Sequence, residues 1–193
     1  MPAPAAVVTT ALDVDRLTAP LVLAFASDAM VRWLLPDPQQ FLLYFPLIVQ
    51  LHAQSVVEHG GAFHTPDFRS AALWYPPGSE VDGVALGNVL ESAVPPERIQ
   101  TALSLFARMG EYKPAGPHWY LRQIGVDPAL QGRGYGSLLL RRALEACDRA
   151  RLPAYLEATS SENRRLYEKF GFVAAAELQF GDSPPVWPMT RRS

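Results

Sequence analysis

Three glycines in five positions, Gly132, Gly134 and Gly136, stand between a strand-like run and a leucine-rich helical segment. Glycine lets the backbone approach a ligand closely and adopt conformations that a Cβ atom would forbid. At the start of a helix, free backbone N–H groups and the positive end of the helix dipole converge and favour an anion. The segment therefore predicts a strand–loop–helix unit that binds the phosphate or pyrophosphate of a cofactor.

The elements around this loop predict the fold class. Residues 118–126 are rich in aromatic and branched side chains and predict a strand, which Asp127-Pro128 ends. The expected elements after the loop are a helix to Arg151, a strand at 154–158, a helix at 162–170 and closing strands at 172–176 and 186–190. This order is typical of an α/β or α+β domain with a mixed sheet.

Prolines and glycines divide the first half of the chain. We expect a short strand at 7–12, a helix from Asp13 or Asp15 to about Trp33, a second helix at 39–59, strands at 62–65 and 71–75, a loop from Gly78 to Pro95, and a helix from Pro95 or Pro96 to about Met109. The whole chain, residues 1–193, is long enough for one domain with a sizeable core, since 49% of its residues are hydrophobic.

Composition excludes several classes of partner. The net charge is −2, and the one concentration of basic residues, at 133–151, is too small for a nucleic-acid interface. Residues 41–57 are interrupted by polar side chains and predict no membrane span. The single cysteine, Cys147, excludes an internal disulfide and favours a reducing compartment, so we expect a cytoplasmic protein.

Two familiar phosphate-binding loops fit poorly. A P-loop requires a lysine before its Ser or Thr, whereas Ser137 follows Gly136 directly. A dinucleotide-binding fingerprint requires a third glycine where this chain has Ser137 or Leu139. Glu157 does lie at the distance expected for a ribose-binding acid, but too little chain follows it for the remaining units of a dinucleotide domain.

A third loop fits better. Gln131-x-x-Gly134-x-Gly136 is similar to the pyrophosphate motif of the GCN5-related N-acetyltransferases, and residues 156–172 resemble that family's next strand, helix and turn. The resemblance covers residues 118–175. Within the family, residues 118–191 are most similar to puromycin N-acetyltransferase and its relatives.

The resemblance implies a single domain with a mixed, mostly antiparallel sheet, a splayed central strand pair and flanking helices. It implies acetyl-CoA as cosubstrate and no metal, with residues 118–175 as the acetyl-CoA core and residues 1–115 mainly on the acceptor side. The residues expected to bind the cofactor are Ile124, Gly125 and Val126 along the pantetheine, Gln131, Gly132, Arg133, Gly134, Tyr135, Gly136 and Ser137 around the pyrophosphate, and Asn163.

The same resemblance assigns chemistry to two side chains. Tyr167 would donate a proton to the leaving sulfur, and Asn163, four residues earlier, shares its helix face. Glu157 is the first candidate for the base that deprotonates the amine, with His118 and Tyr120 as weaker ones. His52, His59 and His64 form no metal-ligand pattern and are interpreted as surface or capping residues, and Cys147 as core.

The acceptor is the least determined part of the prediction. The candidate walls of an aromatic pocket, which would suit a small but bulky amine, are Trp33, Tyr44, Phe45, Trp74 and Tyr120. A protein or peptide acceptor, or a domain that binds CoA without turnover, are the alternatives. The apolar, proline-rich segment 179–191 is a candidate contact of a homodimer.

Overall fold

The computed structural model describes residues 7–8 and 13–192, in which seven strands form one sheet of order β1-β2-β3-β4-β5-β7-β6. The strands are β1 (Val7–Val8), β2 (Ala62–His64), β3 (Ser70–Tyr75), β4 (Trp119–Val126), β5 (Ala154–Ala158), β6 (Val173–Ala174) and β7 (Trp187–Arg191). Neighbours pair antiparallel except β4 and β5, which are parallel. The predicted mixed, mostly antiparallel sheet is confirmed; residues 9–12 of the first predicted strand lie outside the described residues.

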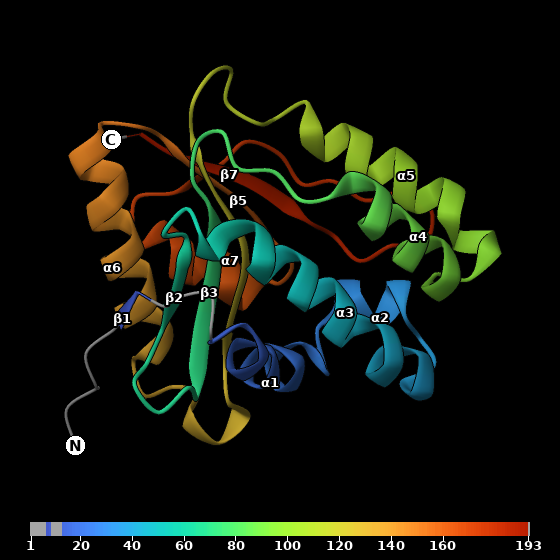
Figure 1. Cartoon of the computed structure of the whole chain (residues 1–193). Coiled ribbons are helices and arrows are strands. Elements are labelled where there is room, and N and C mark those ends of the chain that lie inside the picture. The colour runs from blue at the N-terminus through green and yellow to red at the C-terminus, as the bar shows by residue number, and fades with distance from the viewer. Residues whose placement is uncertain (1–6, 9–12, 193) are drawn as a thin grey trace.

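Helices cover both faces of the sheet (Figure 1). Those of the described residues are α1 (Val14–Phe25), α2 (Ala29–Leu34), α3 (Pro38–Val57), α4 (Gly83–Ala93), α5 (Pro96–Gly110), α6 (Tyr135–Ala150) and α7 (Ser161–Glu168). Apolar residues of α1, α3 and α4 pack on one face of the sheet, and those of α6 and α7 pack on the other. A third cluster joins α2 and α5 to the segment before β7.

The central strand pair separates part of the way along its length. β4 and β5 are paired only from Trp119 with Ala154 to Leu121 with Leu156, while β4 continues to Val126 paired with β3 alone. The backbone groups that β4 and β5 turn toward each other beyond Leu121 and Leu156 therefore lack a strand partner. This opening is the predicted splay, and it sets the position of the candidate site.

Two predictions about the first half were wrong. The helix expected from Asp13 or Asp15 to Trp33 is two helices, because Asp28 adopts an extended conformation and caps α2 by accepting from the Val31 N–H at 2.9 Å. The segment expected to be a loop, Gly78 to Pro95, contains α4. Asp82 caps this helix by accepting two backbone N–H groups, and three apolar side chains, Leu86, Val89 and Leu90, pack on the core. These contacts outweigh the low helix propensity of Gly83 and Gly87.

The closing strand lies inside the sheet. β7 pairs with both β5 and β6, and Trp187, Pro188 and Met189 are buried within the fold. The apolar character of segment 179–191 is thus used in the core of this chain. A dimer contact there stays a prediction.

One helix of the described residues, α3, is long and apolar enough to cross a membrane by length and composition alone. Eight of its residues are buried, and all of these except His52 belong to the core that packs on the sheet. A buried core helix passes the same test of length and composition, so this feature is weak support for a membrane span.

Candidate active site

The glycine loop joins β4 to α6 and leaves backbone N–H groups available. Gly132 and Gly134 have φ values of 74° and 88°, the left-handed region that favours glycine, and a Cβ atom at either would meet open space. Gly134 caps α6 without a side-chain hydrogen bond, so the first amides of α6, from Tyr135 to Ser137, have no helical acceptor. These amides are available to an anion, and phosphate binding at this loop stays a prediction.

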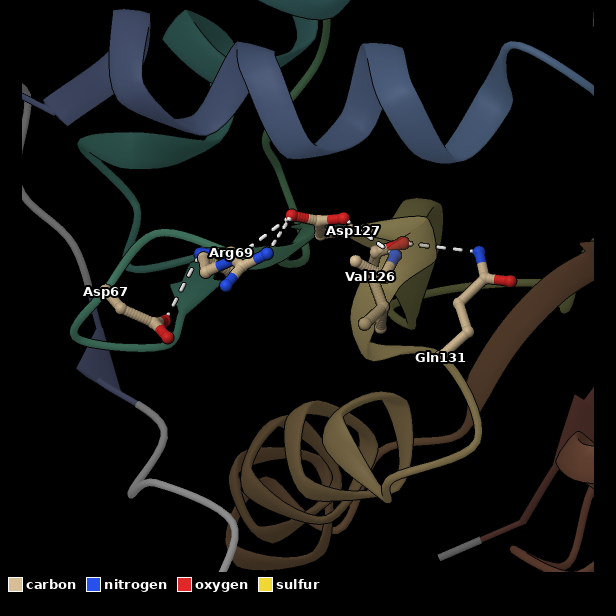
Figure 2. A network of polar contacts seen from close by, with 6 residues as sticks. Asp67, Arg69, Val126, Asp127 and Gln131 are labelled. Atoms are coloured by element: carbon tan, nitrogen blue, oxygen red, sulfur yellow. Dashed lines mark hydrogen bonds and ion pairs between the residues drawn. The ribbon is translucent and has the colours of Figure 1, made fainter.

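Polar contacts hold the two ends of this loop (Figure 2). The Gln131 side-chain amide donates to the Val126 carbonyl at 3.3 Å, which folds the loop back on the end of β4. Arg69, just before β3, donates to Asp127 from Nε at 3.1 Å and from NH2 at 2.7 Å. Asp127 also caps a short 3-10 helix, Pro128–Leu130, by accepting from the Ala129 N–H at 2.8 Å. The Arg69 guanidinium lowers the pKa of Asp127, which stays ionised.

Beyond the loop, a small cavity of about 130 Å³ occupies the opening between β4 and β5. Residues of both strands line it, among them Arg122, Gln123 and Ile124 from β4 and Leu156 and Glu157 from β5. Asn163 and Tyr167 of α7 line the same cavity. The structure therefore brings the two predicted catalytic residues and Asn163 together at the splay.

Tyr167 is 5% exposed, and its hydroxyl makes no hydrogen bond with the described residues. A buried tyrosine hydroxyl usually has a partner, so this one is available to a ligand. Burial, and secondarily the negative charge of Asp28, raise the pKa of Tyr167. Asp28 is held in turn by the Thr159 hydroxyl, which donates to it at 2.6 Å. The phenol is therefore protonated throughout the physiological range.

Glu157 is half-buried at the junction of this cavity with a larger one. Burial raises the pKa of Glu157, whereas the charge of Arg122, the Tyr120 hydroxyl, the charge of Lys113 and the Tyr155 hydroxyl lower it, and the net shift is upward. A carboxylate with a raised pKa is a better proton acceptor than an ordinary glutamate. Its position and environment suit a general base.

The larger cavity, of about 550 Å³, lies beside Glu157. Its walls come from β3, α4, α5 and the segment that leads into β4, and they include Tyr75, Lys113, His118 and Tyr120. Tyr75 and Tyr120 stack with their ring centroids 6.1 Å apart. A cavity of this size with two aromatic walls can hold a small organic molecule.

The two tryptophans predicted as pocket walls lie elsewhere, which corrects that part of the prediction. Trp74 is fully buried in the cluster under α6, on the face of the sheet away from the larger cavity. Trp33 packs between α2 and α5, where its Nε1–H donates to Asp182 at 3.1 Å. Neither side chain lines either cavity, whereas Tyr120 does.

Three polar residues at the cavities were not predicted from the sequence. His52, taken as a surface residue, is 2% exposed, and its Nδ1 lies 2.7 Å from the Tyr75 hydroxyl. Arg122 sits in the middle of an otherwise alternating strand, and Gln123 is buried beside it. The signal available was a charged residue inside the predicted strand 118–126, because a charge in a core strand requires a partner or a function.

The other predicted site residues surround the opening or the loop. Ile124 borders the small cavity, and Gly125 packs so closely on α1 that a Cβ atom would lie 2.7 Å from the Cβ of Ala24. Arg133 and Gln131 are exposed on the loop, and Gly136 and Ser137 are half-buried at the start of α6. No cluster of three or more His, Cys, Asp or Glu residues suited to a metal occurs in the part of the chain that the structure describes.

Comparison with known proteins gives a consistent answer. Residues 62–172 match the model of the acetyltransferase (GNAT) family. An uncharacterized N-acetyltransferase of Schizosaccharomyces pombe is 29% identical over 181 residues, covering 84% of this chain and 72% of the relative.

Solved structures share the fold. A Corynebacterium glutamicum structure, described as histone acetyltransferase HPA2 and related acetyltransferase, has a TM-score of 0.70 at 24% identity, covering 98% of this chain and 97% of that one. Mosquito arylalkylamine N-acetyltransferase like 5b has a TM-score of 0.62 at 13% identity, covering 97% and 99%. Because the family model spans more than half of the chain, this protein belongs to the GNAT family of acetyltransferases.

Proposed function

We propose that this N-acetyltransferase uses acetyl-CoA to acetylate the amine of a small molecule by direct transfer, with Tyr167 as general acid and Glu157 as general base. The observation that carries the proposal is the meeting of both side chains at the opening between β4 and β5, where both line the small cavity and Glu157 also lines the larger cavity with the aromatic walls. We also propose that the protein belongs with puromycin N-acetyltransferase and its relatives, which residues 118–191 resemble.

Three features of the chain suit coenzyme A. The amides at the start of α6 and the open space around Gly132 and Gly134 suit a pyrophosphate. The unpaired strand edges suit an extended, amide-containing arm, which can bond as another strand would. Gln123 lines the opening, and its buried Oε1 has no hydrogen-bond partner among the residues that the structure describes. This oxygen can therefore accept a hydrogen bond from an amide of that arm.

Acetyl-CoA, when bound, supplies the acetyl group as a reactive thioester. Glu157 accepts the proton that the amine nitrogen loses as the new nitrogen–carbon bond forms. Tyr167 donates its proton to the sulfur as the carbon–sulfur bond breaks, and burial, with the charge of Asp28 second, raises its pKa and keeps the phenol protonated until then. The backbone N–H groups of β4 next to the opening are placed to polarise the acetyl carbonyl.

A small acceptor is favoured over a protein. The larger cavity, at about 550 Å³, falls in the range of small-molecule sites, and α4 and α5 contribute to its walls. A peptide substrate would require an open groove across these helices. A non-catalytic CoA-binding module is the remaining alternative, and the unpartnered Tyr167 hydroxyl argues against it.

Calorimetric titration of the purified protein with acetyl-CoA tests the cofactor, with NADH and NADPH as controls. Saturable binding of acetyl-CoA alone is the expected result, and amine-dependent thiol release then tests turnover. Absence of acetyl-CoA binding would overturn the proposal. Binding without thiol release by any amine or peptide would favour the non-catalytic module.

A further inference from the structure

Two positively charged and two negatively charged side chains line the larger cavity. Arg122 and Lys113 are its cations, and Glu157 and Glu80 are its acids. No ion pair within 4.0 Å involves either cation among the residues that the structure describes. A half-buried guanidinium usually has an anionic partner, since removing an unpaired charge from water is costly. The charge of Glu157 acts on Arg122 from beyond that distance, and the absence of a direct ion pair at this guanidinium requires an explanation.

Arg122 is aimed at the cavity by an irregularity in β4. The register between β3 and β4 shifts there, with Leu73 opposite Gln123 but Trp74 opposite Leu121, so Arg122 is the extra residue of a β-bulge. Bulges redirect side chains and occur beside active sites. The bulge brings the Arg122 guanidinium to the junction of the two cavities.

Neutral partners then fix the orientation of this guanidinium. Arg122 Nε donates to His52 Nε2 at 3.3 Å, and NH1 donates to the Tyr120 hydroxyl at 3.2 Å. Burial first, and the charge of Arg122 second, lower the pKa of His52, so its ring is neutral and Nε2 can accept. His52 Nδ1–H then faces the Tyr75 hydroxyl. This arrangement holds Arg122 without neutralising its charge.

The guanidinium has five N–H donors, and these contacts use two of them. The remaining donors form the planar fork that binds carboxylates in a bidentate manner. Lys113 supplies a second positive charge, with its ammonium 4.5 Å from the centre of the Tyr120 ring. Arg122 and Lys113 thus flank the stacked tyrosine that forms a wall of the larger cavity.

We propose that Arg122, assisted by Lys113, binds a carboxylate of the acceptor, so that the substrate is an amine that also carries a carboxylate, in the manner of an amino acid. This inference rests on the proposed function. The amine of such a molecule lies toward Glu157 and the thioester, and its carboxylate lies on the Arg122 fork. The carboxylate is not altered in the reaction.

The arrangement also links recognition to catalysis. The positive charge of Arg122 lowers the pKa of Glu157 and so weakens it as a base. A carboxylate on Arg122 offsets that charge and makes Glu157 more basic when the correct acceptor is bound. An amine without a carboxylate lacks this effect, and it also leaves the guanidinium unpaired.

The test uses amino acids and their decarboxylated amines, with tyrosine and tyramine as the first pair, and the variants Arg122→Met and Arg122→Lys. Arg122→Met should lower kcat/KM for tyrosine by about 10- to 100-fold, the usual effect of losing a charge-assisted hydrogen bond, and for tyramine by less than about threefold. Comparing each variant with wild type cancels the different reactivities of the two amines. Arg122→Lys should recover part of the loss, and Lys113→Met should show a smaller loss confined to tyrosine.

Arg149→Met, on the exposed surface of α6, is the matched control and should leave both substrates unchanged. Circular dichroism and acetyl-CoA binding verify that each variant is folded. An equal loss with both members of a pair would place Arg122 at the thioester and overturn the inference. So would acetylation confined to amines without a carboxylate, or no acetylation of any amino acid by a protein that binds acetyl-CoA. Failure to bind acetyl-CoA would instead overturn the proposed function.

Discussion

Replacing Tyr167 with phenylalanine separates catalysis from folding in this protein. The hydroxyl makes no hydrogen bond with the described residues, so phenylalanine removes no native contact of that group. The ring stays in place against Phe172, with the two centroids 6.1 Å apart. We expect the free energy of unfolding to change by less than about 0.5 kcal/mol, because the hydroxyl borders the small cavity and its removal breaks no hydrogen bond.

The effect on turnover should be large. Loss of a general acid typically lowers the rate by about 100- to 10,000-fold, which corresponds to about 2.7 to 5.4 kcal/mol of activation free energy. Burial and Asp28 raise the pKa of Tyr167, so the wild-type rate should show no loss from this group below about pH 10. Thiol release under saturating acetyl-CoA and amine measures kcat, and urea denaturation measures stability.

Tyr44→Phe is the matched control, because this half-buried tyrosine of α3 lines neither cavity and its loss should leave kcat unchanged. Binding of acetyl-CoA should be similar in all three proteins. A Tyr167→Phe variant with the wild-type kcat would remove Tyr167 from the mechanism. A large loss of stability would show instead that the hydroxyl has a structural partner.

Three further predictions concern the loop, the base and the cysteine. Glu157→Gln should lower kcat/KM at least about 100-fold and abolish the fall in kcat/KM at low pH. In the wild type this fall should occur above the usual pH range of a glutamate, because Glu157 acts as a base only when it is ionised and burial raises its pKa. Gly134 has a φ of 88°, so Gly134→Ala should destabilise the protein by about 1–2 kcal/mol in urea denaturation and weaken acetyl-CoA binding in calorimetry. Gly110→Ala is the control and should change neither property, because Gly110 has no positive φ and a Cβ atom there would meet open space. Cys147 should react with a thiol reagent at pH 8 only when the protein unfolds, because burial raises its pKa to about 12; rapid reaction of the native protein would contradict this.

The second half of the chain was predictable because its signals are local. The glycine loop, Pro153 and the Ser160 cap each fix an element boundary through backbone chemistry, and the Ser160 hydroxyl accepts the Asn163 N–H at 3.1 Å as expected of a cap. Tyr167 and Asn163 share a helix face for the same local reason. The elements around the predicted cofactor site followed from these signals.

The acceptor side was less predictable because it depends on contacts distant in sequence. The face on which Trp74 lies is set by the register of β3 against β4, which shifts beside Trp74, and strand periodicity alone does not reveal such a shift. Arg122 and His52 are 70 residues apart and meet only when α3 packs on the sheet. In the sequence, Asp82 favours a helix after it, whereas the two glycines of the segment favour a loop. The segment is helical because α4 packs on the core, and this contact is distant in sequence.

The opening between β4 and β5 also affects how the protein resists heat. Exposed strand edges elsewhere promote association between chains, but these two edges face each other within one sheet between layers of helices. A ligand that bonds to them fills a gap in the sheet and binds only the folded chain. At a concentration 100 times its dissociation constant, such a ligand adds about 2.7 kcal/mol to the stability. The melting temperature of this protein should therefore rise with the supply of its cosubstrate.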